Sequence, residues 1–214
     1  MTSSSITDFS IIPANKLSIA ARWLGKRIYG VGINDADYIT SPTIKGRQLV
    51  CPLYKTWTNM LTRCYSAKAQ EKNPSYIGST VCDEWVSFMA FRAWMVTQDW
   101  QDKHLDKDLL IIGNKEYSPK TCIFIPPAIN TLLNKQESAG AGTPLGVRID
   151  KRDGVFQAFV SKRGRKVYLG RYSTQGEASA AYRKAKADHI KGLAQKEAEP
   201  LRSALMRHAK LIGG

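Results

Sequence analysis

The strongest constraint on the fold comes from residues 146–192, where the hydrophobic period changes from two residues to about 3.6. Three short runs of alternating residues come first: GVRID, VFQAFVSK and KVYLGRYS. In the second run, Phe156, Ala158 and Val160 fall on one face, because successive side chains of a strand point to opposite sides. Gly154 and the KRGR segment supply turns between the runs. The pattern predicts a three-stranded antiparallel sheet.

The segment TQGEASAAYRKAKADHI, which follows the third run, is typical of a helix. Thr174 and Glu177 have the spacing of a capping box at a helix N-terminus. Ala178, Ala181 and Ala185 recur on one side of that helix, and small side chains let a helix lie close to a sheet. The sequence therefore predicts one helix packed on the three strands.

The charge of the chain is unevenly distributed. The 214 residues carry a formal net charge of +14. Residues 1–134 hold 15 Lys and Arg against 11 Asp and Glu, a net of +4, whereas residues 135–214 hold 17 against 7, a net of +10. A basic excess of this size favours a polyanionic partner. With 43% hydrophobic residues, the chain is expected to fold.

A small, polar, Gly-rich segment, KQESAGAGTPLG, has the composition of a linker. We therefore expect four parts: residues 1–134, a linker over residues 135–145, the sheet-and-helix module over residues 146–192, and a helical tail over residues 193–214 that breaks at Pro200.

The part before the linker combines helices with short strands, and the fold class is therefore α+β. After a helical or irregular start, a β-hairpin is expected around residues 29–39, turned by NDAD. CPLYKTWTNMLTRCYSA places Trp57, Leu61 and Cys64 at helical spacing. EWVSFMAFRAWMVTQDW predicts a second helix with a wide aromatic face, and AINTLLNKQ predicts a third. HLDKDLLIIGNKEYSPKTCIFIP predicts two short strands joined by a loop.

Residues 146–192 resemble the plant ethylene-response-factor (APETALA-type) DNA-binding domain, a version of which phage and bacterial homing endonucleases carry. The resemblance rests on GVR, G-x-F-x-A-x-V, V-Y-L-G-x-Y and T-x-x-E-A-x-x-A-Y, with Phe156 in place of the usual Trp. It implies that the sheet lies in the major groove of double-stranded DNA with the helix behind it. The residues that it implies face the DNA are Arg148, Asp150, Gln157, Phe159, Ser161, Lys166 and Tyr168.

Basic residues in the turns and at the strand ends suit contacts to DNA phosphates. They are Lys151, Arg152, Lys162, Arg163 and Arg165, and Arg171 completes the set predicted to bind DNA. Phosphate contacts supply affinity without sequence choice.

Residues 54–134 are similar to phage and bacterial proteins grouped with the HNH endonucleases. The shared motifs are W-x-N-M-x-x-R-C-Y, V-C-x-x-W-x-x-F-x-x-F, L-D-(R/K)-D, the segment GNKEYSPKTC and a late Asn. The resemblance implies a ββα element that cleaves or nicks DNA with a divalent cation, Mg²⁺ or Mn²⁺. The order of the two modules is that of phage homing endonucleases, which implies a phage-encoded protein in the cytoplasm of a bacterial host.

The resemblance places the candidate catalytic residues in and around LDKD. Asp106 and Asp108 offer hard oxygen ligands to the metal, with help from Asn130. Lys107 is expected to stabilise charge on the phosphate, and His104 is the nearest histidine. If the strand continued through this segment, the two aspartates would share one face and Lys107 would lie on the other.

Two departures from the HNH pattern support an alternative function. Lys107 stands where the catalytic histidine is expected, and Thr121 replaces the Asn that usually precedes the Cys. The alternative is a catalytically inactive DNA-binding or regulatory protein on the same scaffold, and LDKD also fits a polar turn with solvated charges. RNA binding through the sheet is less favoured, because the strand order does not match an RNA-recognition module with its aromatic signatures.

The four cysteines are widely spaced and are expected to be reduced and buried. We do not expect a zinc site made from Cys64, Cys82 and Cys122 with a histidine, because structural zinc sites usually carry closely spaced ligand pairs. The sequence has no apolar run of about 18 residues, the least that a transmembrane helix requires, and its start does not read as a signal peptide. We therefore expect a cytoplasmic protein without a membrane partner.

Overall fold

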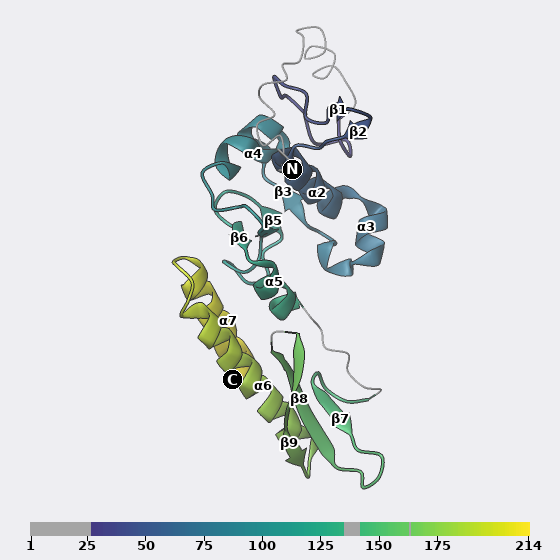
Figure 1. Ribbon diagram of the computed structural model, residues 1–214, viewed down its shortest axis with the longest axis vertical. Coiled ribbons are helices and arrows are strands. Elements are labelled where there is room, and N and C mark those ends of the chain that lie inside the picture. The colour runs from purple at the N-terminus through teal and green to yellow at the C-terminus, as the bar shows by residue number, and fades with distance from the viewer. Residues whose placement is uncertain (1–26, 135–141, 163) are drawn as a thin grey trace. The chain divides into compact units, whose positions relative to one another are not determined.

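The computed structural model describes residues 27–134, 142–162 and 164–214, which combine helices and short strands in an α+β fold (Figure 1). The predicted start of the chain before residue 27, most of the predicted linker and Arg163 lie outside the described residues. Within the described ranges, no helix combines the length and the apolar character needed to cross a membrane.

The chain forms two compact units, and each contains two stretches of sequence. Of the described residues, the first holds those up to Gln101 together with Ile111–Phe124, and the second holds Asp102–Leu110 together with those from Ile125 to Gly214. The LDKD segment therefore belongs to the same unit as the C-terminal module.

Helix α2 (Pro52–Tyr65) provides the core of the first unit and confirms the first predicted helix. Pro52 opens it, where a fixed φ favours the helix and the missing N–H costs nothing. The side chains at helical spacing are buried, including Trp57 and Leu61. The indole Nε1 of Trp57 donates to the backbone oxygen of Trp85 at 2.8 Å, which satisfies its only polar group inside the core.

The second predicted helix is shorter than its aromatic pattern suggested. A 3₁₀ turn, η3 (Asp83–Val86), comes first, and α4 (Phe88–Met95) follows after Ser87. Ser87 adopts an extended backbone, and its side chain accepts a hydrogen bond from the N–H of Ala90 at 3.0 Å. Because an N-cap serine starts a new helix, the predicted single helix is divided at this residue.

The prediction of a hairpin around residues 29–39 is wrong. In this segment Ile28 forms an isolated bridge with Gly32, and Ile33 forms one with Ser87. Asp35, in the predicted turn, instead accepts hydrogen bonds from Ser87 Oγ at 2.6 Å and from the N–H of Met89 at 2.8 Å. Asp35 therefore caps α4 and does not serve as a turn residue of a hairpin.

A short hairpin does form slightly later, between β1 (Thr43–Ile44) and β2 (Arg47–Gln48). Its two turn residues, Lys45 and Gly46, have φ values of 49° and 74°. Positive φ at both central residues is typical of a type I′ turn, whose backbone twist matches that of the two strands in a two-residue hairpin.

Three strands, not the two predicted, occur between residues 104 and 125. They are β4 (His104–Asp106), β5 (Glu116–Tyr117) and β6 (Ile123–Ile125). β5 pairs in parallel with β3 (Thr80–Val81), and β4 forms a two-stranded sheet with β6. Helices α3 (Ala67–Lys72) and η2 (Pro74–Tyr76) lie between α2 and β3, and α5 (Pro127–Asn134) follows β6 and confirms the third predicted helix.

The C-terminal module confirms the predicted antiparallel sheet. Its strands are β7 (Val147–Ile149), β8 (Phe156–Lys162) and β9 (Arg165–Tyr172), in the order β7-β8-β9. Helix α6 (Gln175–Ala194) packs on one face of this sheet (Figure 1). The capping box predicted at its N-terminus is present. Val147, Ala158 and Ala178 form the buried centre of that contact.

The tail also follows the prediction, since α7 (Leu201–Gly213) begins after Pro200. It packs along α6 with Leu201, Ala204, Leu205 and Ala209 buried. Small side chains on both helices allow a close approach: a Cβ added to Gly213 would lie 3.4 Å from that of Ala187.

Candidate functional site

The outer face of the C-terminal sheet, which does not pack on α6, carries most of the residues predicted to bind DNA. Ala158 and Val160 of β8 are buried on the inner face, so Gln157, Phe159 and Ser161 lie on the outer one. The strand register aligns these residues with neighbours on β7 and β9: Arg148 with Gln157, Gln157 with Arg171, Phe159 with Tyr168, and Ser161 with Lys166. We call these seven residues the outer sheet face.

An aromatic pair lies at the centre of the outer sheet face. The ring centroids of Phe159 and Tyr168 are 5.4 Å apart at an interplanar angle of 51°, and Tyr168 is 52% exposed. Arg148 Cζ and Lys166 Nζ each lie 5.7 Å from the centroid of the Phe159 ring, within the range of cation–π attraction. The face therefore combines an apolar centre with two flanking positive charges.

Asp150 has a structural role that the sequence did not predict. Its carboxylate, only 10% exposed, accepts a hydrogen bond from Gln157 Nε2 at 2.9 Å and another from the N–H of Arg152 at 3.1 Å. These contacts hold the turn between β7 and β8 and fix the amide of Gln157. Asp150 therefore orients a residue of the outer sheet face.

Basic side chains surround the same face at the turns. Arg152 is the most open, with a side chain that is 91% exposed, and Lys151 and Arg165 are exposed as well. Lys162 is half-buried. Arg171 forms an ion pair with Asp153. These positions allow phosphate contacts around the apolar centre.

The residues of the second candidate site come together between β4 and α5. His104 and Asp106 lie on the same side of β4, because the buried Leu105 between them points the other way. Asn130 of α5 places its Nδ2 2.9 Å from Nδ1 of His104. This contact joins two predicted catalytic residues that lie 26 positions apart in the chain.

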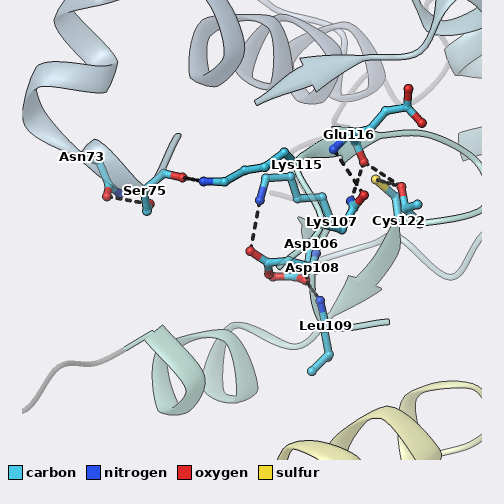
Figure 2. A network of polar contacts seen from close by, with 11 residues as sticks. Asn73, Ser75, Asp106, Lys107, Asp108, Leu109, Lys115, Glu116 and Cys122 are labelled. Carbon is cyan, nitrogen blue, oxygen red and sulfur yellow. Dashed lines mark hydrogen bonds and ion pairs between the residues drawn. The ribbon is translucent and has the colours of Figure 1, made fainter. Parts of the chain in front are cut away.

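Asp106 is the most buried carboxylate of the candidate site. Its Oδ1 accepts hydrogen bonds from the N–H groups of Asp108 at 3.1 Å and Leu109 at 2.8 Å (Figure 2). Burial, and then the charge of Asp108, raise the pKa of Asp106, and the two backbone N–H groups oppose that rise. The turn therefore brings two carboxyl groups into electrostatic contact.

Strand alternation predicts that the Lys107 side chain points away from both aspartates, but in the structure it contacts Asp108. The Lys107 side chain is 7% exposed, and its Nζ lies 3.0 Å from Asp108 Oδ2 (Figure 2). Because β4 ends at Asp106, the alternation of a strand does not extend to the following residues. Lys107 therefore balances the charge of Asp108.

The paired carboxyl groups fit a hard divalent cation only in part. Burial raises the pKa of Asp106, and the charge of Asp108 adds to the rise, so the two carboxylates interact. Together they offer oxygen ligands to Mg²⁺, which keeps several water ligands in protein sites. Asn130, the third predicted ligand, contacts His104 instead. In residues 27–134, 142–162 and 164–214, no group of three or more His, Cys, Asp or Glu side chains is placed to hold a metal ion.

The cysteines are free thiols; Cys51, Cys64 and Cys122 are buried, and Cys82 is half-buried. Burial raises the pKa of the Cys82 thiol. None of the four is joined in a disulfide.

Sequence reasoning missed the neighbours that α7 brings to the LDKD loop. Arg207 Nη2 donates to the backbone oxygen of Leu110 at 3.1 Å. The pKa of His208 is lowered by burial and by Lys186, whereas Asp108 raises it. Because Arg207 and Leu110 are 97 residues apart, no local pattern indicates their contact.

Comparisons of the chain with protein-family models, curated proteins and solved structures found no match.

Proposed function

We propose that the protein binds double-stranded DNA through the outer sheet face and cleaves or nicks it at the LDKD segment. The observation that carries the proposal is the arrangement of Arg148 and Lys166 around an exposed aromatic centre, within a module of strong positive charge. Cations attract the phosphates, and a flat sheet face offers side chains to the base edges in the groove.

Binding by this face predicts a steep dependence on salt, because each neutralised phosphate releases counterions. The test is fluorescence anisotropy with a labelled duplex of mixed sequence at several salt concentrations. Replacing both Arg148 and Lys166 by alanine is expected to weaken binding by at least tenfold, whereas replacing Lys68 and Lys72 of α3 is expected to change it little. Equal affinities for the two variants would contradict the assignment of the outer sheet face.

The cleavage step is assigned to His104 and the two aspartates. A half-turn of the Asn130 amide would let its Oδ1 accept from Nδ1–H of His104, and the lone pair would then lie on Nε2. In this form Nε2 takes a proton from water, and the water oxygen bonds to phosphorus as one ester P–O bond breaks. The leaving oxygen keeps the electron pair of that bond and takes a proton from solvent water. A Mg²⁺ or Mn²⁺ ion held by Asp106 and Asp108 would stabilise the charge on the phosphate.

The test of cleavage is nicking of supercoiled plasmid with Mg²⁺ or Mn²⁺. We expect the wild-type protein to relax the plasmid, and Asp106→Asn and His104→Ala to lose most of that activity. Asp102→Asn is the matched control, since Asp102 is an exposed aspartate just before β4. Wild-type rates in Asp106→Asn would show that the site is assigned wrongly.

The second candidate function is DNA binding without cleavage. It is favoured by the ion pair between Lys107 and Asp108, which occupies one of the two carboxylates that would hold the metal. Salt-sensitive DNA binding with no nicking, in either metal and at several protein concentrations, would establish this function in place of the nuclease.

A further inference from the structure

The centre of the outer sheet face is apolar, whereas the residues around that centre are basic. Two polar residues of the outer sheet face already interact within the protein: Gln157 donates a hydrogen bond to Asp150, and Arg171 forms an ion pair with Asp153. Phe159 and Tyr168 instead present hydrocarbon next to them. An apolar centre with cations beside it suits a surface that offers both phosphate and methyl groups.

We propose that Phe159 and Tyr168 read thymine, by contact with its 5-methyl group in the major groove. This inference rests on the proposed binding of double-stranded DNA and adds the base that the centre of the face selects. In the major groove, thymine presents a methyl group beside its O4 acceptor, and none of the other three bases presents a methyl group. An aromatic side chain gains affinity from that methyl group by excluding water from it.

The geometry of the pair favours contact through the ring edges. Phe159 and Tyr168 are cross-strand partners, and their rings are tilted by 51°, so they form one continuous apolar surface and not a flat stack. Arg148 and Lys166 both lie over the Phe159 ring at 5.7 Å. A base that stacked on this ring, as in single-strand recognition, would have to displace these cations.

Arg148 and Lys166 also position the Phe159–Tyr168 pair on the duplex. They attract phosphates on either side of the groove, and such contacts fix the register of a protein on the duplex without reading its sequence. Because Arg148 and Lys166 contact phosphates, they do not select a base. The contact of the rings with the methyl group adds the selection of thymine. On the outer sheet face, the two cations thus supply affinity and the two rings supply selection of thymine.

The experiment uses the full chain and begins with selection of bound sequences from a pool of random duplexes. Each thymine of the selected duplex is then replaced by uracil, which removes the methyl group and keeps every hydrogen-bonding atom. We expect about a fourfold loss of affinity for each methyl group that the rings contact, from the usual gain on burying one such group. Replacements elsewhere in the duplex are expected to change affinity little.

Variants assign the effect to the aromatic pair. The double variant Phe159→Ala with Tyr168→Ala is expected to bind thymine and uracil duplexes equally, whereas Phe159→Leu, which keeps an apolar side chain, is expected to retain a preference for thymine. Leu211→Ala is the matched control, because Leu211 is an exposed apolar residue on α7 and is 65% exposed. It is expected to discriminate as the wild type does.

The outcomes separate this inference from the proposed function. Tight, salt-sensitive binding of the selected duplex with no thymine–uracil difference would overturn thymine reading and leave DNA binding intact. Absence of binding to any duplex would overturn both. Tighter binding to the separated strands than to the duplex would replace methyl contact by base stacking and would also overturn the inference.

Discussion

At the scale of single residues, Gly146 shows how closely α6 approaches the sheet. Its φ of 74° lies in the left-handed region, and an added Cβ would collide with the ring of Tyr182. Both the backbone conformation and the available space therefore require glycine at this position.

We expect Gly146→Ala to destabilise the protein by about 2–4 kcal/mol, from backbone strain together with overpacking. Gly154→Ala is the matched control, since Gly154 has a φ of 73° but nothing within 4 Å of its added Cβ. It is expected to cost only about 1 kcal/mol, from the backbone alone. Urea unfolding measures both, and equal losses in the two variants would contradict the role of Tyr182.

We expect His208 to make the free energy of unfolding depend on pH. Its pKa in the folded protein lies below the ordinary value of 6.5, because burial and Lys186 disfavour the charged form. The unfolded chain therefore binds the proton more readily, so the free energy of unfolding falls as the pH decreases below about 6.5. His208→Gln is expected to remove this part of the pH dependence. Urea unfolding of both proteins between pH 5 and pH 8 measures the difference, and parallel curves would contradict the prediction.

At the scale of elements, the success of sequence reasoning depended on how local the contacts were. The C-terminal module was predicted because its strands are joined by short turns and its helix follows at once. The hairpin around residues 29–39 was not, because Asp35 bonds to Ser87 and Met89, more than 50 residues away. In the same way, β3 and β5 are two-residue strands that pair across a long separation, so neither shows a periodic pattern.

The cap of α4 gives a prediction at this scale. Asp35→Ala removes the acceptor for Ser87 Oγ and for the N–H of Met89, and we expect a loss of about 1–2 kcal/mol, as for other helix caps. Asp37→Ala is the matched control, because Asp37 is exposed and lies in the same segment. Thermal unfolding compares them, and a loss in Asp37→Ala as large as in Asp35→Ala would show that the segment matters only through its charge.

The geometry of the candidate site could not be predicted from the sequence, which named only its residues. The motif resemblance named His104, Asp106 and Asn130, whereas the contact of Asn130 with His104 depends on how α5 packs against β4. The ion pair of Lys107 with Asp108 depends on where β4 ends, which the pattern of LDKD does not indicate.

At the scale of the whole molecule, the uneven charge distribution bears on how DNA would be held. Residues 135–214 carry a net charge of +10 and residues 1–134 only +4, so most of the electrostatic attraction is expected from the C-terminal part. The candidate site at LDKD contains two aspartates, which repel a phosphate unless a cation accompanies them. Binding is therefore expected to persist without a divalent metal, while cleavage requires one.

This separation predicts that a single basic turn residue affects binding and not the candidate site. Lys151→Ala, in the exposed turn after β7, is expected to weaken binding to all duplexes alike and to reduce the slope of log affinity against log salt by about 1. Lys68→Ala, an exposed lysine on α3, is expected to leave that slope unchanged. Anisotropy titrations in EDTA at several salt concentrations measure both slopes. If Lys68→Ala lowered the slope as much as Lys151→Ala, the basic excess would act as a diffuse charge and not through the outer sheet face and its turns.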